Sequence, residues 1–271
     1  MPRTADPSPT SPLARTRTCL AILGLILAVG GPAALAATAK TEPVDVAVAS
    51  NFLLTLRALE RRFETATGSR LLISHGSTGM LYARISNGAP IDVFLAADSD
   101  STERLVDDGL ALPDSRITYA RGRLVLWSNA PENRDQDCLK LLQTGRFKRL
   151  AIANPRLAPY GTAARETLQK LRLWRSLRKS VIRGGNINQA FQYVITQNAD
   201  LGFVALSQLK AGDIKSAGCR WVVPENFHTP LVQTAVLLKR GEGKPAARAL
   251  MDFIVADATR VFIRNMGYLV Q

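Results

Sequence analysis

The chain has 271 residues, of which 46% are apolar and 21% are charged. This is an ordinary globular composition, which excludes disordered and fibrous classes, and the length suffices for one large domain or two modest ones. The formal net charge is +13, yet the Lys and Arg residues are scattered and lack the aromatic interleaving of nucleic-acid binders. We therefore expect a basic surface that attracts anions, and no nucleic-acid partner.

The first residues of the chain differ from the rest. Positively charged residues precede an almost purely apolar run at 20–30, and small residues ending in Ala34-Leu35-Ala36 follow it. This order is typical of a secretory signal peptide, and the apolar run is too short to span a bilayer comfortably. We predict a signal peptide over residues 1–36 and export to the periplasm, with a second A-x-A site at 37–39 leaving the cleavage point open.

Beyond residue 40 the chain alternates short strands and helices, which is typical of parallel α/β architecture. Apolar alternation and short apolar runs predict strands, and apolar residues at helical spacing predict helices. The predicted strands are 44–48, 71–73, 91–96, 123–127, 149–153, 201–205 and 232–238. The predicted helices cover 52–63, 80–85, a segment starting at Asp100, 164–171, a segment around 190–194, 244–255 and 259–266.

Four turns share one design, in which a strand is followed by a short turn and a helix start. They are Ser50-Asn51, Ser77-Thr78, Tyr160-Gly161 and Ile187-Asn188. A helix N-terminus offers unpaired backbone N–H groups and a positive dipole end, and ligands of open α/β sheets lie beyond the carboxyl ends of the strands. Such residues are also preferred helix caps, so a single turn would indicate little. The repeated pattern indicates anion sites.

Four segments of the chain resemble the periplasmic molybdate-binding proteins of ABC transporters, in the same order and spacing. They are 46–64 (VAVASNFLLTLRALERRFE), 74–98 (SHGSTGMLYARISNGAPIDVFLAAD), 153–171 (ANPRLAPYGTAARETLQKL) and 199–209 (ADLGFVALSQL). The resemblance runs from about Val44 to the C-terminus. It implies a type II periplasmic-binding-protein fold, in which two α/β lobes are joined by two crossover strands. We expect one lobe at 40–121 plus 231–271 and the other at 122–230.

The resemblance also implies which residues contact an oxyanion. These ligand-binding positions are Ser50, Asn51, Ser77, Thr78, Tyr160 and Ile187. Ile187 is expected to act through its backbone N–H. Some relatives have a contacting tyrosine where this chain has Ala205, so the chain resembles a branch that relies on Asn51 and Tyr160 instead. The sequence leaves open whether Tyr160 uses its backbone N–H or its hydroxyl.

The function that the resemblance implies is capture of molybdate or tungstate, without chemistry, and delivery to the membrane permease of an ABC importer. We expect a monomer with no cofactor and no directly ligated metal, since the metal arrives as an oxyanion. Sulfate or phosphate is the alternative ligand. An enzyme is disfavoured, because there is no Gly-x-Ser-x-Gly elbow and neither His75 nor His228 has a triad context. We expect Asp98 to be a cap or turn residue, and Arg84 and Arg183 to lie on the surface.

Two cysteines, Cys138 and Cys219, follow the predicted signal peptide. Two thiols in an exported chain favour a disulfide, whereas two buried free thiols are the alternative. The sequence alone does not show whether their Cα atoms lie within the distance that a disulfide can bridge.

Overall fold

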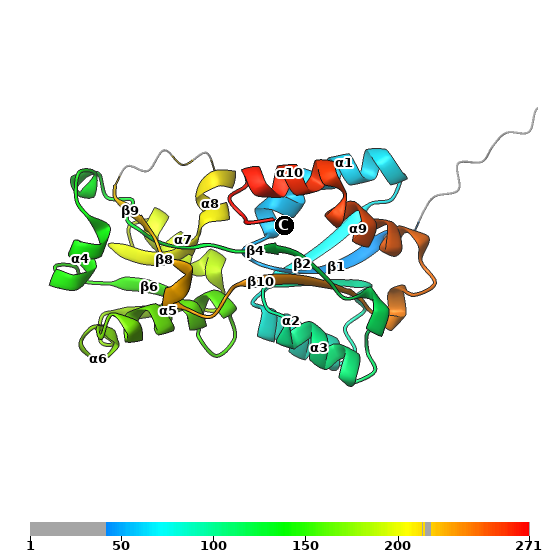
Figure 1. Ribbon diagram of the computed structural model, residues 1–271, viewed down its shortest axis with the longest axis horizontal. Coiled ribbons are helices and arrows are strands. Elements are labelled where there is room, and N and C mark those ends of the chain that lie inside the picture. The colour runs from blue at the N-terminus through cyan, green and yellow to red at the C-terminus, as the bar shows by residue number, and fades with distance from the viewer. Residues whose placement is uncertain (1–41, 213, 215–217, 271) are drawn as a thin grey trace, which may run out of the picture. The chain divides into compact units, whose positions relative to one another are not determined.

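The computed structural model describes residues 42–212, 214 and 218–270, so the predicted signal peptide lies outside the described residues. In the described part, no helix is both long and apolar enough to cross a membrane. The strands form two five-stranded mixed sheets, each covered by helices (Figure 1). We call each sheet with its helices a lobe.

The first lobe contains the sheet with the order β2-β1-β3-β10-β4. Its strands are β1 Val44–Ala49, β2 Leu71–Gly76, β3 Val93–Ala96, β4 Ile117–Arg121 and β10 Val232–Leu237. Its helices are α1 Leu53–Thr67, α2 Thr78–Ser86, α3 Asp100–Asp107, α9 Pro245–Val255 and α10 Asp257–Asn265. Helices α1, α9 and α10 pack on one face and α2 and α3 on the other (Figure 1), so the central strands are buried on both sides.

The second lobe contains the sheet with the order β7-β6-β8-β5-β9. Its strands are β5 Leu124–Trp127, β6 Leu150–Ala153, β7 Val181–Gly184, β8 Leu201–Ala205 and β9 Arg220–Val222. Its helices are α4 Cys138–Thr144, α5 Pro159–Lys170, α6 Trp174–Leu177, α7 Ile187–Ile195 and α8 Leu206–Ala211. Trp127 stacks on Phe191 at 5.4 Å between ring centroids, which joins the sheet to α7 in one core.

The two lobes repeat one strand plan. In each, three neighbouring strands are parallel, and a fourth strand pairs antiparallel with both the third and the edge strand. The chain passes between the lobes twice, from β4 to β5 and from β9 to β10. The Gly122 N–H of the first crossover donates to the Leu231 carbonyl of the second at 2.8 Å. The predicted two-lobed α/β fold with two crossovers is confirmed.

Helix α1 illustrates how the sequence forms these elements. Leu56, Leu59 and Phe63 recur at helical spacing and are fully buried, whereas the intervening arginines face solvent. The helix ends at Gly68, whose φ of 72° places it in the left-handed region that glycine adopts without strain. The chain then enters β2, which pairs parallel with β1, so that the turn after β2 lies beside the turn after β1.

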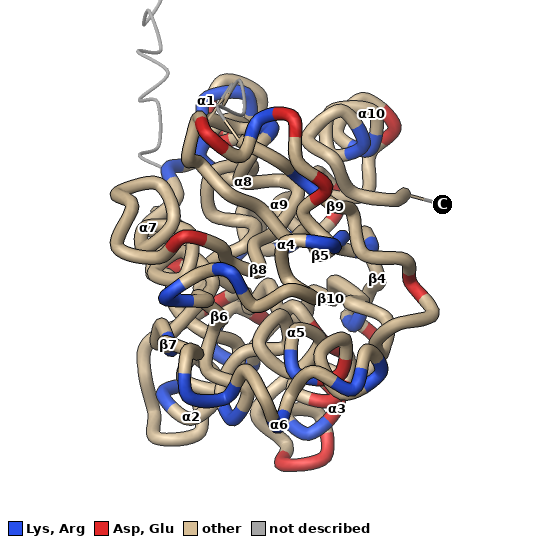
Figure 2. Tube along the Cα trace, turned by 90° about the vertical axis from the view of Figure 1, so that its left-hand side faces the viewer, with Lys and Arg blue, Asp and Glu red and all other residues tan. Residues whose placement is uncertain are grey.

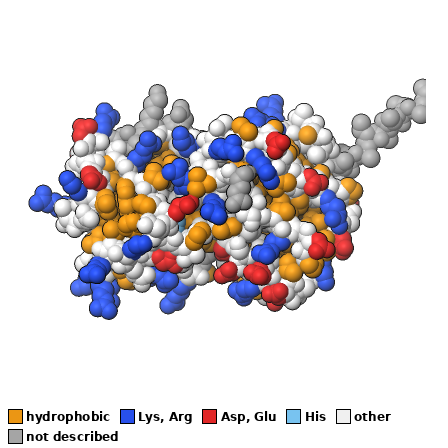
Figure 3. Space-filling view, viewed as in Figure 1, with side chains coloured by type: hydrophobic (Ala, Val, Ile, Leu, Met, Phe, Trp, Pro, Cys, Tyr) orange, Lys and Arg blue, Asp and Glu red, His pale blue; other side chains and the backbone are white. Residues whose placement is uncertain are grey.

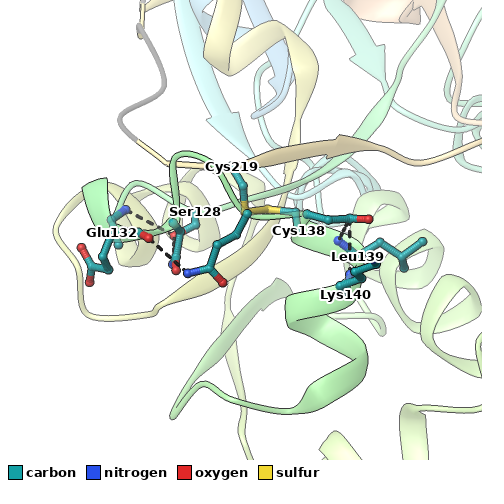
Figure 4. Close-up of a disulfide and its surroundings, with 10 residues drawn as sticks. Ser128, Glu132, Cys138, Leu139, Lys140 and Cys219 are labelled. Atoms are coloured by element: carbon teal, nitrogen blue, oxygen red, sulfur yellow. Dashed lines mark hydrogen bonds between the residues drawn. A yellow bond between two sulfur atoms is a disulfide. The ribbon is translucent and has the colours of Figure 1, made fainter.

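A disulfide joins Cys138 to Cys219, with an S–S distance of 2.05 Å and a Cα–Cα distance of 5.4 Å (Figure 4). Cys138 is the first residue of α4, and the Asp137 carboxylate caps that helix by accepting from the N–H groups of Leu139 and Lys140. The Ser128 N–H donates to the Cys219 carbonyl, so the bridge fixes α4 against the end of β5 and the segment entering β9.

Three strands of the structure are absent from the sequence prediction. They are β4, β7 and β9, and each forms an edge of its sheet. An edge strand is covered less completely, so its apolar pattern is weaker, and β9 has only three residues. Helix α5 also begins at Pro159 rather than at 164, because proline is favoured at the first helical position.

Candidate anion-binding site

The four predicted turns meet at one small cavity to which both lobes contribute. It is lined by Ala49, Ser50, Asn51, Gly76, Ser77, Thr78, Ala97, Ala158, Pro159, Tyr160 and Ile187. The space measures about 190 Å³ including its opening. All six residues predicted to contact a ligand are brought together here. The size suits a compact ion of a few heavy atoms and not a sugar or a peptide.

The first lobe contributes hydroxyl groups from two turns. Ser50 follows β1, and both its N–H and its Oγ donate to the Gly76 carbonyl at 2.9 Å, which holds the first two turns together. Ser77 precedes α2, and its buried hydroxyl has no hydrogen-bond partner among the residues that the structure describes. The Thr78 Oγ1 accepts from the Ala97 N–H at 3.1 Å, so its own proton is available to a ligand.

The second lobe contributes the N-termini of α5 and α7. Ile187 is the first residue of α7, and the Asn186 side chain caps that helix through the Gln189 N–H at 3.1 Å. Tyr160 follows Pro159, the first residue of α5. A Cβ at Gly161 would lie 2.3 Å from the Ala153 carbonyl oxygen, so only glycine lets α5 start this close to the end of β6.

Backbone N–H groups of the lining residues are further potential donors. The N–H groups of Asn51, Thr78, Tyr160 and Ile187 donate to no residue that the structure describes. Three of them lie in the first turn of a helix, where N–H groups have no intrahelical partner and the dipole is positive. None of the lining residues carries a charge. The cavity is therefore a set of neutral donors, which is a suitable environment for an anion.

The Asn51 side chain does not point its donors at the cavity. Its Nδ2 donates to Gln233 Oε1 at 2.6 Å and to the Tyr268 hydroxyl at 3.1 Å. The Asn51 carbonyl accepts from the Tyr268 hydroxyl at 2.8 Å and from Ser207 Oγ at 3.0 Å. What Asn51 can offer an anion is thus its backbone N–H.

The partners Gln233, Tyr268 and Ser207 were not predicted from the sequence. They lie 156 to 217 residues from Asn51 along the chain, so no local pattern connects them. The only available signal is Gln233 itself, an amide inside the apolar strand β10 that is fully buried.

The hydroxyl of Tyr160 also lies away from the ligand cavity. A Cβ at Gly122 would be 2.0 Å from the Tyr160 hydroxyl oxygen and 3.2 Å from Gln233 Nε2, so the phenol packs against the first crossover. Burial raises the pKa of Tyr160 well above its usual value, so the phenol stays protonated. The Asn51 amide is near enough to oppose that pKa shift, but no atom of the described residues meets hydrogen-bond geometry with the Tyr160 hydroxyl. The geometry favours the backbone N–H as the Tyr160 donor.

The remaining polar candidates lie outside the cavity. His75, Arg84 and Arg183 are exposed. The Asp98 carboxylate, just before the N-cap Ser99, accepts from the Ser101 N–H in the first turn of α3 at 2.9 Å, while burial raises its pKa. In the part of the chain that the structure describes, no group of three His, Cys, Asp or Glu residues could hold a metal ion.

Charge is spread over the molecule and is not concentrated at the cavity. Lys and Arg residues occur on many elements (Figure 2), and on the face in Figure 3 their side chains alternate with apolar and acidic ones. Long-range attraction of an anion therefore comes from the net charge, and its capture from the neutral donors.

Comparison with known proteins identifies the family. The family model for bacterial extracellular solute-binding proteins matches residues 44–269. This chain belongs to that family. The predicted resemblance is thereby confirmed, and a solute-binding role of the family agrees with a cavity lined by hydrogen-bond donors.

The relatives of this solute-binding protein are close in sequence and in structure. The molybdate-binding protein ModA of Azotobacter vinelandii is 42% identical over 91% of this chain and 97% of its own length. ModA of Rhodobacter capsulatus is 39% identical, covering 88% of this chain and 92% of its own. A solved structure of the A. vinelandii periplasmic molybdate-binding protein superposes with a TM-score of 0.80 at 39% identity, covering 84% of this chain and 99% of that one.

Proposed function

We propose that this protein binds molybdate, or tungstate, in the cavity between its lobes and delivers it to the membrane permease of an ABC importer. The observation that carries the proposal is a compact cavity lined by neutral hydrogen-bond donors from both lobes. Relatives that are 42% and 39% identical are molybdate-binding proteins, which supports the choice of ion. We propose that it acts as a monomer in the periplasm, after removal of a signal peptide at residues 1–36.

In this proposal the ion receives hydrogen bonds from three hydroxyls and four backbone N–H groups. The hydroxyls are those of Ser50, Ser77 and Thr78, and the N–H groups are those of Asn51, Thr78, Tyr160 and Ile187. Hydrogen bonds to a dianion are strong in a site that excludes water. The Ser50 hydroxyl turns its proton from the Gly76 carbonyl to the ion, and that carbonyl keeps the Ser50 N–H.

The same donors also determine how the site distinguishes molybdate from other oxyanions. A protonated oxyanion such as hydrogen phosphate presents its own O–H, which leaves one of the fixed donors without an acceptor. A smaller tetrahedron such as sulfate spans the distance between the two lobes less well. A buried donor left unpaired is costly, so each mismatch lowers the affinity.

Closure of the lobes completes this site. We propose lobe boundaries at 40–121 plus 231–271 and at 122–230, which the division of strands between the two sheets supports. An ion that bridges hydroxyls of one lobe and N–H groups of the other is bound fully only when the lobes are together. Binding therefore favours the closed arrangement, which the permease then recognises.

Titration calorimetry on the mature, ligand-free protein tests the function. We expect one-to-one binding of molybdate and tungstate, with sulfate and phosphate far weaker. A preference for sulfate or phosphate would replace the proposed ion, and the absence of heat with all four ions would reject an oxyanion-binding role.

A further inference from the structure

We propose that Gln233 is a positioning residue for the anion site, acting through Asn51, an inference that rests on the proposed function. Gln233 does not line the cavity. Its Oε1 accepts from Asn51 Nδ2 at 2.6 Å, and its Nε2 donates to the Leu231 carbonyl at 2.9 Å. The amide thus connects the first ligand turn to the second crossover.

The first crossover is bonded to the same carbonyl group, that of Leu231. The Leu231 carbonyl also accepts from the Gly122 N–H at 2.8 Å. One continuous set of hydrogen bonds therefore runs from Asn51 through Gln233 to both segments that link the lobes. The Tyr160 ring, from the second lobe, packs against Gly122 beside this set. We call the two crossover segments at Gly122 and Leu231 the hinge. A change in their geometry is therefore transmitted directly to the turn that carries the Asn51 N–H.

The role of the Asn51 side chain follows from the direction of its bonds. Both hydrogens of its Nδ2 are donated away from the cavity, to Gln233 and to Tyr268. Tyr268 returns a hydrogen bond to the Asn51 carbonyl, and Ser207 of the second lobe adds another. With side chain and carbonyl both fixed, the turn cannot rotate, and the backbone N–H that we propose as a donor keeps one direction.

Burying an amide side chain in an apolar strand costs free energy of folding unless hydrogen-bond partners satisfy it. Gln233 is 0% exposed and lies in β10, whose other residues are mostly apolar. An apolar residue of similar size would pack there without needing partners. The orientation of Asn51 accounts for a glutamine at this position.

Gln233→Leu tests the inference, with the dissociation constant measured on folded protein by calorimetry. We expect molybdate affinity to fall about 10- to 100-fold and the ratio of molybdate to sulfate affinity to decrease, because the N–H of the turn is no longer fixed. Thr167→Val is the matched control: it removes another buried hydrogen bond, from Thr167 Oγ1 to the Ala163 carbonyl, that touches neither cavity nor hinge. The control is expected to change stability without changing affinity.

A double-mutant cycle separates positioning from a structural role. If Gln233 acts through the Asn51 side chain, Asn51→Leu and Gln233→Leu together weaken binding no more than either alone. Additive losses, or an unchanged affinity and selectivity in folded Gln233→Leu, would overturn the inference. If Gln233→Leu does not fold, Gln233→Met takes its place, because it keeps the length of the side chain and removes both amide groups that bond Asn51 and Leu231. An affinity loss below twofold in folded Gln233→Met overturns the inference. Absence of molybdate binding by the unaltered protein would instead reject the proposed function.

Discussion

The two lobes contribute different kinds of hydrogen-bond donor to the cavity. The first lobe presents the side-chain hydroxyls of Ser50, Ser77 and Thr78, together with backbone N–H groups. The second presents Tyr160, whose hydroxyl packs against Gly122, and Ile187, whose side chain has no donor. The first half of the site therefore depends on which residues stand in the turns, and the second half on where two helices begin.

The lobes also differ in how they are held together. The second contains the Cys138–Cys219 disulfide. The first instead buries Asp92, which is 0% exposed and is paired with Arg240 at 2.5 Å and Lys244 at 2.9 Å. Removing the disulfide should therefore affect the stability of one lobe and leave the donors at the cavity in place.

The largest effect is expected from loss of this disulfide. Replacing both cysteines by serine, or adding a reductant, should lower the free energy of unfolding by about 2–4 kcal/mol, because the bridge restrains a long segment of the unfolded chain. Chemical denaturation measures this loss. Molybdate affinity at a temperature where the protein is folded should change less than about threefold; a larger change would place the bridge in the binding mechanism.

Ile187→Pro should weaken molybdate binding about 100-fold, by removing a single backbone donor. Proline is tolerated here because Ile187 is the first residue of α7 and Asn186 before it is extended, with φ of −150° and ψ of 178°. Calorimetry gives the affinity and circular dichroism checks the helix. Ile187→Val keeps the N–H and should bind normally; equal losses in both variants would contradict a backbone role.

Ser77→Ala should weaken molybdate binding about tenfold, since a hydroxyl that bonds a charged ligand contributes about 1.5 kcal/mol or more. The ligand-free protein should be as stable as the unaltered one, because the Ser77 hydroxyl has no partner to lose. Thermal unfolding with and without molybdate separates the two effects. Normal affinity in this variant would remove Ser77 from the site.

Tyr160→Phe should have the smallest effect, with affinity within about threefold of the unaltered protein, because the hydroxyl lies against Gly122 and forms no hydrogen bond with the described part of the chain. Calorimetry under the conditions used for Ile187→Pro makes the comparison direct. A tenfold or greater loss would show that the hydroxyl reaches the ion and that the second lobe, like the first, uses a side chain.

The sequence permitted prediction of the fold because central strands and amphipathic helices leave local patterns. Residues 44–48, with alternating valines, and 201–205, with a short apolar run, were both predicted as strands and are strands in the structure. The edge strands β4, β7 and β9 escaped prediction, since their residues are less completely buried and their pairing is specified by a neighbouring strand.

The turns at Ser50, Ser77, Tyr160 and Ile187 were visible in the sequence because a strand, a turn and a helix start are consecutive in the chain. Only the tertiary structure decided which atoms face the cavity. The Asn51 amide turns to Gln233 and the Tyr160 hydroxyl turns to Gly122, and these partners are supplied by distant segments at the hinge. Local sequence determines where helix N-termini arise, whereas side-chain direction depends on long-range packing that no local pattern records.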